Sequence, residues 1–413
     1  MTSLNVLWWL AYHLQPIVSP RWLERRYVAA ARLASRLAAE DRPTIAAHRR
    51  ILVDVTVIAR HDAGTGIQRV VRSTLHGMRA KASGEVSVAA IRFDGVAFRH
   101  TAWPAVAETT EEIVVMGPGD VFLGLDMSLD AIRRNARGLL RWKRAGAHFW
   151  FVVYDLLPLS YPEHFSAKVA VRFRWWLTTI AGLADGFLCI SRHTADDMSA
   201  VLQTRFGVDD VSVDVIPMGF DIQTAERPAS AASDVLAELG SAAVLLAVGT
   251  LEPRKGYALL LDACERAWAG GVAANLVIVG RAGWKAAGLE RRITGHPEIR
   301  RRLHWFPTLD DAGLLALYDR ASALVAASYD EGFGLPVLEA IARGRPVLAR
   351  DIPAFRVHAG HGLRYFPREA DADQLAAAIT DLLDHLAAAP PLPEAPHLPD
   401  WQATATAVLA KIG

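Results

Sequence analysis

Short runs of consecutive apolar residues alternate along the chain with longer segments in which apolar positions recur at helical spacing. The short runs are rich in β-branched and aromatic residues, which is typical of parallel strands that are buried on both faces. The predicted strands are residues 51–58, 86–93, 121–125, 149–154, 186–190 and 213–217, then 244–249, 276–280, 303–306, 323–327, 346–349 and 363–366. The predicted helices are residues 67–79, 167–181, 194–202, 257–268, 310–320, 336–343 and 372–386. Two such series predict an α/β protein with two doubly wound, Rossmann-like domains facing a central cleft.

A polar segment rich in alanine and serine separates the two series at residues 223–233 and is interpreted as a linker. We therefore expect an N-terminal domain over residues 51–222 and a C-terminal domain over residues 241–388. Five prolines within residues 389–399 interrupt the chain before a last helix at 399–413, for which a return to the N-terminal domain is one option. The total of 413 residues agrees with two or three domains.

Composition excludes several classes of protein. The 45 Lys and Arg residues nearly balance 44 Asp and Glu residues, so bulk electrostatic binding of nucleic acid is not expected. An apolar content of 52% excludes a disordered chain. Only two cysteines are present, Cys189 and Cys264, which excludes a disulfide framework or a four-thiolate zinc site and indicates a reducing, cytoplasmic compartment.

The sequence of residues 1–50 predicts an amphipathic extension before the first domain. Its apolar start is too short for a membrane span, and no basic residue precedes it as a secretory signal requires. Tryptophans and arginines in this region suit a helix in the membrane interface: Trp8, Trp9, Trp22, Arg21, Arg25 and Arg26. A helix packed on the protein itself explains the same pattern.

Residues 330–340, with the sequence DEGFGLPVLEA, carry two glutamates around a glycine-rich turn. Pro336 suits the first turn of a helix, so the backbone amides of residues 333–335 are expected at a helix N-terminus, where an anion can bind. Glu331 could accept a hydrogen bond from a sugar hydroxyl, and Glu339 could accept two from a ribose diol. Two solvated glutamates beside a tight turn are the alternative.

Residues 249–256, with the sequence GTLEPRKG, join a predicted strand to a predicted helix. Arg254 supplies a fork of donors to a phosphate, and Lys255 supplies a compact positive charge. Together they could neutralise a diphosphate. An ordinary surface Arg-Lys pair is the alternative, and the sequence does not match a Walker A loop.

A third glycine-rich turn, residues 64–70 with the sequence GTGIQRV, follows the first predicted strand. It does not complete the Gly-x-Gly-x-x-Gly fingerprint, which disfavours a nicotinamide-dependent dehydrogenase. Asp126 and Asp155 also follow predicted strands. Because ligands bind beyond the carboxyl ends of the strands in open α/β sheets, these positions are candidate site residues.

The spacing from Glu331 to Glu339 resembles the Glu-x7-Glu motif of retaining glycosyltransferases of family 4, which have the GT-B fold. Residues 248–256 resemble the phosphate loop of that family, and the resemblance extends from about residue 51 to 366. In the N-terminal half, residues 64–72 and 154–158 resemble the branch that builds O-antigen, lipopolysaccharide and other bacterial surface polysaccharides, which includes mannosyl- and rhamnosyltransferases.

The resemblance implies a donor site for a nucleotide diphosphate sugar linked to GDP, dTDP or UDP. Its residues would be Gly66, Gly249, Arg254, Lys255, Phe333, Gly334, Leu335 and Glu339. Those with catalytic roles would be Glu331, Arg254, Lys255 and, on the acceptor side, Asp155. Two positions depart from the family: Tyr154 stands where many members have His, and Val357 stands where a Glu is expected after Arg356.

The resemblance also implies a hexose or deoxyhexose, with mannose or rhamnose favoured, transferred with retention of configuration to a growing surface glycan. Arg254, Lys255 and a helix N-terminus can offset the charge of the leaving diphosphate. No Asp-x-Asp tripeptide stands at a cleft position to hold a divalent ion, so no metal or cofactor is expected. Basic residues and tryptophans within residues 131–144 and 168–176 suit a polyprenyl-diphosphate-linked acceptor and peripheral contact with the anionic inner face of the cytoplasmic membrane. A solvated helix face with buried tryptophans is the alternative.

Two other functions share this fold. A nucleotide-sugar epimerase would need an acid/base pair around the stereocentre of the sugar, and no clear pair is present. A degenerate, non-catalytic partner would be expected to lack Glu331, Arg254 or Lys255, and all three are present.

Overall fold

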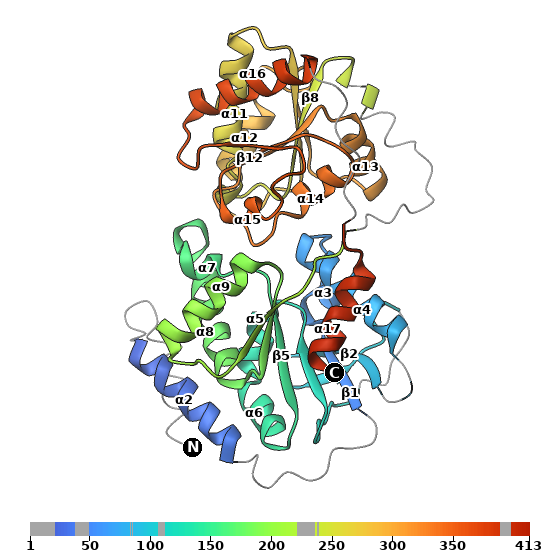
Figure 1. Ribbon diagram of the computed structural model, residues 1–413, viewed down its shortest axis with the longest axis vertical. Coiled ribbons are helices and arrows are strands. Elements are labelled where there is room, and N and C mark those ends of the chain that lie inside the picture. Colours follow the sequence, from blue (N-terminus) through green and yellow to red (C-terminus); the bar gives the residue numbers. More distant parts are fainter. Residues whose placement is uncertain are drawn as a thin grey trace. The chain divides into compact units, whose positions relative to one another are not determined.

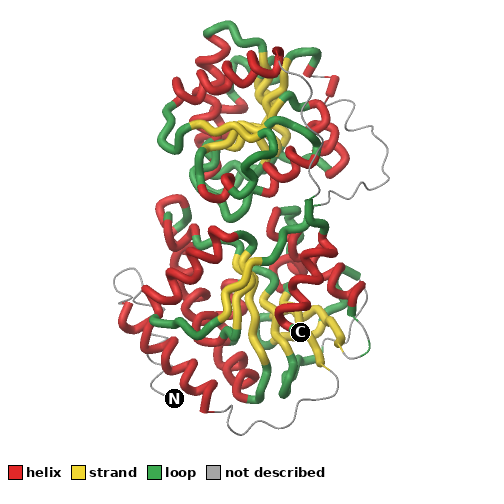
Figure 2. Tube along the Cα trace, viewed as in Figure 1, coloured by secondary structure: helices red, strands yellow, loops and turns green. Residues whose placement is uncertain are grey.

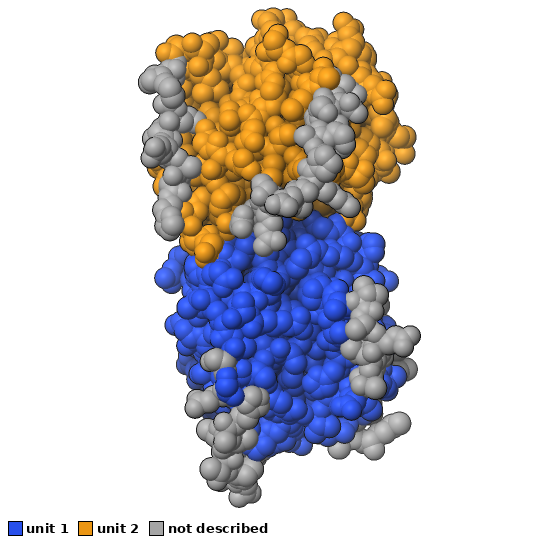
Figure 3. Space-filling view, turned by 90° about the vertical axis from the view of Figure 1, so that its right-hand side faces the viewer, with its two compact units in different colours: residues 1–219, 401–413 blue, residues 220–400 orange. Residues whose placement is uncertain are grey.

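The computed structural model describes residues 21–37, 49–82, 84, 86–105, 112–220, 236–237, 239–388 and 398–413. The chain divides into two compact units (Figure 3): residues 1–219 with 401–413 form unit 1, and residues 220–400 form unit 2. Each unit is a twisted sheet with helices on both faces (Figures 1 and 2). The prediction of an α/β protein is confirmed. Among the described residues, no helix is long and apolar enough to cross a membrane.

The described residues of unit 1 form seven strands: β1 (Arg49–Asp54), β2 (Val86–Phe93), β3 (Phe98–His100), β4 (Val121–Gly124), β5 (His148–Val153), β6 (Gly186–Cys189) and β7 (Ser212–Val215). Their order is β3-β2-β1-β4-β5-β6-β7, and all pairs are parallel except β2 with β3. The helices are α2 (Arg21–Leu37), α3 (Thr56–Arg60), α4 (Gly66–Lys81), α5 (Leu129–Arg134), α6 (Ala136–Arg144), α7 (Leu157–Ser160), η1 (Pro162–His164), α8 (Ala167–Leu183), α9 (Arg192–Val201), η2 (Leu202–Phe206) and α17 (Trp401–Ile412).

In the described part of unit 2 there are six parallel strands: β8 (Ala243–Val248), β9 (Ala274–Val279), β10 (Leu303–Phe306), β11 (Ala323–Ala326), β12 (Val347–Arg350) and β13 (Leu363–Phe366). Their order is β10-β9-β8-β11-β12-β13. The helices are η3 (Pro253–Lys255), α11 (Tyr257–Ala269), α12 (Ala287–Thr294), α13 (Asp311–Arg320), α14 (Leu335–Ala342), α15 (Pro353–Arg356) and α16 (Ala372–Ala388).

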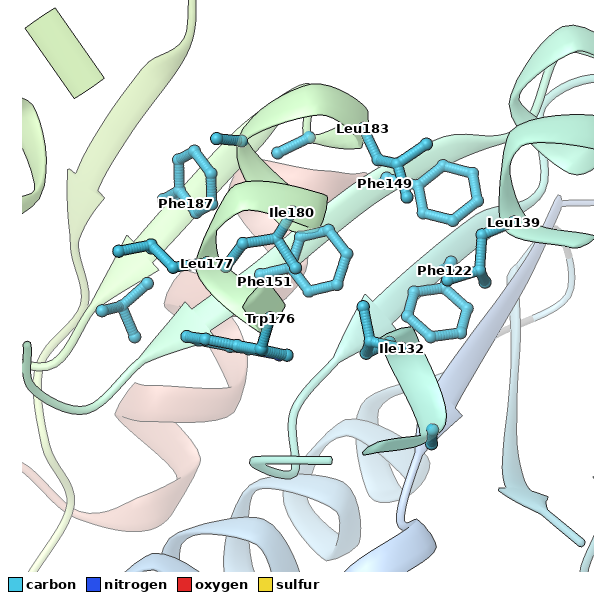
Figure 4. Packing of buried hydrophobic residues seen from close by; sticks show 14 of the residues in the cluster. Phe122, Ile132, Leu139, Phe149, Phe151, Trp176, Leu177, Ile180, Leu183 and Phe187 are labelled. Atoms are coloured by element: carbon cyan, nitrogen blue, oxygen red, sulfur yellow. The ribbon is translucent and has the colours of Figure 1, made fainter. Parts of the chain in front are cut away.

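The core of unit 1 is built mainly from aromatic rings of neighbouring strands. The ring centroids of Phe122 and Phe149 lie 5.3 Å apart, and those of Phe122 and Phe151 lie 5.9 Å apart. Figure 4 shows this layer packing against α8 through Trp176, Leu177, Ile180 and Leu183. Because aromatic side chains bury a large apolar area each, this layer fixes the strands whose carboxyl ends carry polar groups.

The strand order places one switch point in each sheet. Strands added in sequence run outward from β1 on one side and then from β4 on the other, and the same holds for β8 and β11 in unit 2. The loops after these two central strands therefore leave in opposite directions and open a crevice at the carboxyl end of the sheet.

All twelve predicted strands are present, most with shifted ends, but the first was predicted too long. Residues 55–58 were expected to extend the first strand, yet the strand ends at Asp54 and α3 begins at Thr56. Asp126 causes the turn, because its Oδ2 accepts hydrogen bonds from the amides of Val57 at 2.7 Å and Ile58 at 2.8 Å. The first amides of a helix have no partner within it, and Asp126 supplies one for two of them. Residues 56–58 therefore begin a helix, although their sequence is β-branched and mostly apolar.

The N-terminal extension is described only in part. Trp8 and Trp9 lie outside the described residues, as do the proposed linker and most of the proline-rich segment. Helix α2 packs on α8, with Val28 and Ala31 buried. One face of this helix therefore packs on the protein itself, while Trp22 on another face is 58% exposed.

The last helix, α17, lies in unit 1 against α4, far from it in sequence (Figure 1). Thr404 Oγ1 accepts a hydrogen bond from the Gly219 amide at 2.7 Å and donates one to the Pro217 carbonyl at 2.8 Å. A Cβ on Gly219 would lie 2.6 Å from Trp401 Cα, so a glycine is required where the helix packs.

The switch point of unit 1 holds two buried carboxyl groups, Asp54 at the end of β1 and Asp126 after β4. Burial and the neighbouring charge of Asp126 raise the pKa of Asp54 to about 7, although hydrogen bonds from Thr56 act in the opposite direction. Burial also raises the pKa of Asp126, against the hydrogen bonds from Ile58 and Val57. Asp54 is therefore partly protonated at neutral pH.

We expect Thr404→Val to destabilise unit 1, because the buried Gly219 amide would lose its acceptor. The expected loss is about 1–3 kcal/mol of the free energy of unfolding, measured from urea unfolding curves. Thr406→Val is the matched control on the same helix, since the hydroxyl of Thr406 is exposed and bonds only within α17 to the Gln402 carbonyl. Equal losses in both variants would contradict the role of Thr404.

We expect Asp54→Asn to reduce the pH dependence of stability. With a pKa near 7 in the native state and about 4 in the unfolded chain, Asp54 makes the native protein bind more protons between these pH values. The stability therefore falls as pH rises through this window, by at most about 1.4 kcal/mol per pH unit. The asparagine mimics the protonated carboxyl group, so the variant should gain stability relative to the wild type between pH 5 and pH 8.

Unfolding curves at several pH values test this expectation, with the exposed Asp209→Asn as control. The same pH slope in Asp54→Asn and the wild type would show that Asp54 is ionised in the native state throughout this window.

Candidate functional site

Two loops meet at the switch point of unit 2. One runs from β8 through η3 to α11, and the other runs from β11 to α14. Two glycines let them approach. Gly249 has a φ of +140°, and Gly256 has a φ of +69° and lies so close to the other loop that a Cβ would be 2.2 Å from the Ala327 carbonyl oxygen. The Tyr329 amide then donates to the Arg254 carbonyl at 2.8 Å.

The predicted charged residues form one cluster between these loops. Glu331 Oε2 lies 3.0 Å from Arg254 Nη1, and Glu331 Oε1 accepts hydrogen bonds from Lys255 Nζ and, at 2.7 Å, from Ser328 Oγ. Arg254 Nε also lies 2.9 Å from Glu252 Oε2. The structure thus brings Glu331 to Arg254 and Lys255, which lie 77 and 76 residues before it in the sequence.

The electrostatics of the cluster keep Glu331 ionised. Burial alone would raise the pKa of Glu331, but the charges of Lys255 and Arg254, with hydrogen bonds from Lys255 and Ser328, lower it to about 2. Its side chain is 11% exposed, and those of Lys255 and Arg254 are 12% and 19% exposed. Glu331 is therefore a hydrogen-bond acceptor at neutral pH and has no proton to donate.

Glu339 lies on α14 and contacts a different set of residues. It is 4% exposed, and its Oε2 accepts a hydrogen bond from the Tyr318 hydroxyl at 2.6 Å. The helix begins after Gly334, whose φ of +87° is the left-handed conformation that favours glycine. Leu335 is the first residue of α14, and the first amides of a helix have no partner within it.

An open cavity joins part of the site together. Lys255, Glu331 and Gly334 line it, with Tyr257 and Phe355. The Tyr257 hydroxyl donates to the Gly249 carbonyl at 2.7 Å, which holds the start of the phosphate-loop candidate, residues 249–256, in place. The cavity thus connects the charged cluster with the start of α14.

The remaining candidates belong to unit 1. Gly66 is the exposed first residue of α4, after Thr65, which caps the helix through its side chain. It is Gly64, with a φ of +64°, that requires a glycine in this turn. Asp155 follows β5, is partly buried, and accepts a hydrogen bond from the Leu157 amide at 3.1 Å. Gly66 and Asp155 therefore sit on different elements of unit 1.

Sequence reasoning missed several side chains that hold the site. Tyr318 bonds Glu339, and Ser328 bonds Glu331. His358 Nε2 lies 2.9 Å from the Phe333 carbonyl oxygen. The two rings pack edge-on, with their centroids 4.8 Å apart. Only Ser328 lies close enough in sequence to a recognised motif to have been proposed. Tyr318 and His358 come from other elements, and nothing local marks them.

Part of the predicted basic surface is internal. Lys143 is buried and paired with Asp185, and Arg172 is paired with Asp130. Trp175 and Trp176 are 4% and 2% exposed and belong to the core. Within residues 131–144 the exposed basic residues are Arg134, Arg137, Arg141 and Arg144, spaced three or four residues apart along α5 and α6, and Lys168 at the start of α8 is exposed as well. Within the described ranges, no three His, Cys, Asp or Glu residues come together as a metal site.

Several known proteins are similar to this chain. Over 349 residues it is 34% identical to the serotype-specific mannosyltransferase WbdA of Escherichia coli, a match covering 81% of this chain and 43% of that protein. It is 28% identical to the O-antigen chain mannosyltransferase RfbU of Salmonella typhimurium, over 52% of this chain and 55% of that protein. It is 30% identical to the glycogen synthase of Mycobacterium tuberculosis, over 74% of this chain and 81% of that protein. The chain thus spans less than half the length of WbdA.

The fold is similar to that of a solved sucrose-phosphate synthase from Thermosynechococcus elongatus, with a TM-score of 0.62 and 19% identity over 88% of this chain and 98% of that one. This likeness confirms the predicted GT-B type of α/β fold. A family model described as glycosyl transferases group 1 matches residues 232–388, which include the charged cluster and Glu339. The chain therefore belongs to the group 1 glycosyltransferases.

Proposed function

We propose that this chain transfers a hexose or deoxyhexose, with mannose favoured, from a nucleotide diphosphate sugar to a growing bacterial surface glycan. The similarity to WbdA and RfbU, both named mannosyltransferases, supports this choice of sugar. The observation that carries the proposal is the cluster of Arg254, Lys255 and Glu331 at the switch point of unit 2. This is the position at which open α/β sheets bind nucleotides.

In this proposal the donor diphosphate binds to Arg254 and Lys255. Both cations face Glu331 in the structure, so the incoming diphosphate competes with that carboxylate for their charge. As the bond from sugar to phosphate breaks, negative charge grows on the leaving diphosphate, and fixed cations stabilise that change. We therefore propose that the reaction needs no metal ion.

Glu331 is proposed to act on the sugar as a permanent anion. Because its pKa lies at about 2, it can accept a hydrogen bond from a sugar hydroxyl and stabilise positive charge at the reacting carbon, but it cannot serve as a general acid. Both of its oxygens already bind cations or Ser328, which argues against attack on the sugar as a nucleophile. Retention is then proposed to come from attack on the face that the phosphate leaves.

Glu339 and the start of α14 are proposed to complete the donor site. The Tyr318 hydroxyl holds one oxygen of Glu339, and its other oxygen is proposed to accept hydrogen bonds from the ribose diol. The amides of Phe333, Gly334 and Leu335 are proposed to contact the sugar or the diphosphate. In unit 1, Gly66 and Asp155 are proposed to serve the diphosphate and the acceptor.

The acceptor is proposed to be a glycan linked to polyprenyl diphosphate at the inner face of the cytoplasmic membrane. Helices α2 and α6 are neighbours in unit 1, and both present exposed arginines. On α2, Arg26 lies over the ring of Trp22 at 5.9 Å, and Leu33 is 58% exposed. Arginines with exposed tryptophan and leucine are typical of a peripheral membrane surface.

Calorimetry with GDP, dTDP, UDP and their sugar conjugates, in EDTA and in magnesium, tests the donor site. We expect one nucleotide family to bind equally well in both conditions, GDP and GDP-mannose being the favoured pair. No binding of any of these compounds by the folded chain would overturn the transferase proposal and favour a non-catalytic partner.

We expect Glu331→Gln to separate nucleotide binding from sugar binding. Without the competing carboxylate, Arg254 and Lys255 should bind GDP at least as tightly as in the wild type. The sugar should lose a charged hydrogen-bond acceptor, which is worth about 1.5–3 kcal/mol, so GDP-mannose should bind about 10- to 100-fold more weakly relative to GDP.

Glu298→Gln is the matched control for this variant. Glu298 is also ion-paired, to Arg302 at 2.9 Å, but it precedes β10 at the amino end of the sheet. The control should bind both compounds as the wild type does. Weaker binding of GDP itself by Glu331→Gln would contradict the proposed competition.

We expect the chain to co-sediment with vesicles that contain phosphatidylglycerol and not with vesicles of phosphatidylcholine alone. Arg137→Glu/Arg141→Glu should reduce this binding at least about tenfold, since each basic residue near an anionic surface is worth about 1 kcal/mol. Arg291→Glu/Arg301→Glu reverses two exposed arginines of unit 2 and should have little effect. Failure of the wild type to bind anionic vesicles would exclude the membrane proposal.

A further inference from the structure

The segment that carries Glu331 touches a buried arginine of the neighbouring strand. Arg350 is the last residue of β12, which pairs with β11, and it is fully buried. Its Nε donates to the Ala327 carbonyl at 3.1 Å, and its Nη1 donates to the Arg368 carbonyl. Its guanidinium carbon lies 4.3 Å from the ring centroid of Tyr329 and 5.0 Å from that of Phe366.

This arginine is not part of a salt bridge. Among the described residues no carboxylate lies within ion-pair distance of it, and its Nη2 has no hydrogen-bond partner. Burying a cation without a direct ion pair is costly, and the charge of Glu369 favours Arg350 only from beyond ion-pair distance. Overall stability is therefore a poor explanation for a guanidinium at this position.

Its contacts instead fix both sides of Ser328. Ala327 precedes Ser328 and accepts a hydrogen bond from Arg350, while Tyr329 follows Ser328 and stacks on the guanidinium. The Ser328 hydroxyl in turn donates to Glu331 Oε1. Arg350 thus reaches the charged cluster through one short segment of backbone.

The same segment is also tied to the phosphate-loop candidate. The Tyr329 amide donates to the Arg254 carbonyl at 2.8 Å, and Ala327 lies directly against Gly256. If the guanidinium were absent, the Ala327 carbonyl would lose a charged donor and the Tyr329 ring would lose its cation. Cation–π contacts at partly buried sites are worth about 0.5–2 kcal/mol, which is enough to change the order of a surface loop.

We propose that Arg350 is a positioning residue that holds residues 327–331 so that Glu331 faces the donor sugar. The effect on the reaction rests on the proposed glycosyl transfer, whereas the effect on the loop does not. The hydrogen bonds and ring contacts of the Arg350 side chain go to residues 327, 329, 366 and 368, and none goes to Arg254 or Lys255.

Hydrogen exchange of the full chain, followed by mass spectrometry without any nucleotide, tests the loop. In Arg350→Met we expect amide exchange over residues 328–334 to be at least tenfold faster than in the wild type. Arg350→Lys keeps a cation but not the fork of donors and should restore the exchange rate only in part.

Arg320→Met is the matched control. Arg320 also donates to two backbone carbonyls, those of Gly240 and Ala242, both at 2.7 Å, but these precede β8 at the amino end of the sheet. The Arg320→Met variant should show the same rate of amide exchange over residues 328–334 as the wild type. Unchanged exchange in a folded Arg350→Met protein, or equal acceleration in Arg320→Met, would overturn the proposal.

Tyr329→Leu provides a second route should Arg350→Met fail to fold. It removes the ring that stacks on Arg350 from a side chain that is already 38% exposed. We expect a smaller acceleration of exchange over the same residues, and no acceleration would overturn the proposal.

Activity is measured separately, as release of GDP from GDP-mannose. In Arg350→Met we expect kcat to fall at least tenfold and the affinity for GDP to stay within about threefold of the wild type, because Arg254 and Lys255 remain in place. A wild type without any release of GDP would count against the proposed function alone, since the exchange experiment still decides the role of Arg350 in the loop.

Discussion

The ion pairs of Glu331 with Arg254 and Lys255 are the interaction on which the site of unit 2 depends. A buried carboxylate is stable only with compensating charges, and here they come from a loop after a different strand. The pairing therefore requires that the loops after β8 and β11 touch, and this in turn requires the strand order and the glycine at position 256. In this part of the molecule, the strand order, the contact between the two loops and the ion pairs therefore depend on one another.

Each unit has a crevice at the switch point of its own sheet, and the two crevices hold different groups. In unit 2, the switch point holds cations that an anionic ligand can reach. In unit 1, it holds two buried carboxyl groups, Asp54 and Asp126, whose hydrogen bonds go to the backbone of α3 and its surroundings. Those groups shape the loops that follow β1 and β4 and are almost fully buried, whereas Arg254 and Lys255 in unit 2 are partly exposed.

Much of the candidate site in unit 2 could be predicted because its residues lie in two short segments that follow apolar strands. The spacing of Glu331 and Glu339, and the Arg-Lys pair at 254–255, are local patterns that indicate anion and hydroxyl binding. The supporting side chains could not be predicted in this way. Tyr318, Arg350 and His358 lie on α13, on β12 and beyond α15, and each bonds a residue of the site that is at least 21 positions away in sequence. Nothing in their immediate neighbourhoods distinguishes them from ordinary core or surface residues.

The sequence by itself determined the α/β class, the two series of strands and helices, and the charged residues of the loops after β8 and β11. These follow from apolar periodicity and local spacing, which act over a few residues. Only the tertiary structure decided that residues 55–58 turn into a helix on Asp126, that Trp175 and Trp176 belong to the core, and that Glu331 is held as a permanent anion. Each of these outcomes depends on a partner from a distant part of the chain, and burial and charge pairing are properties of the packed structure, not of a segment.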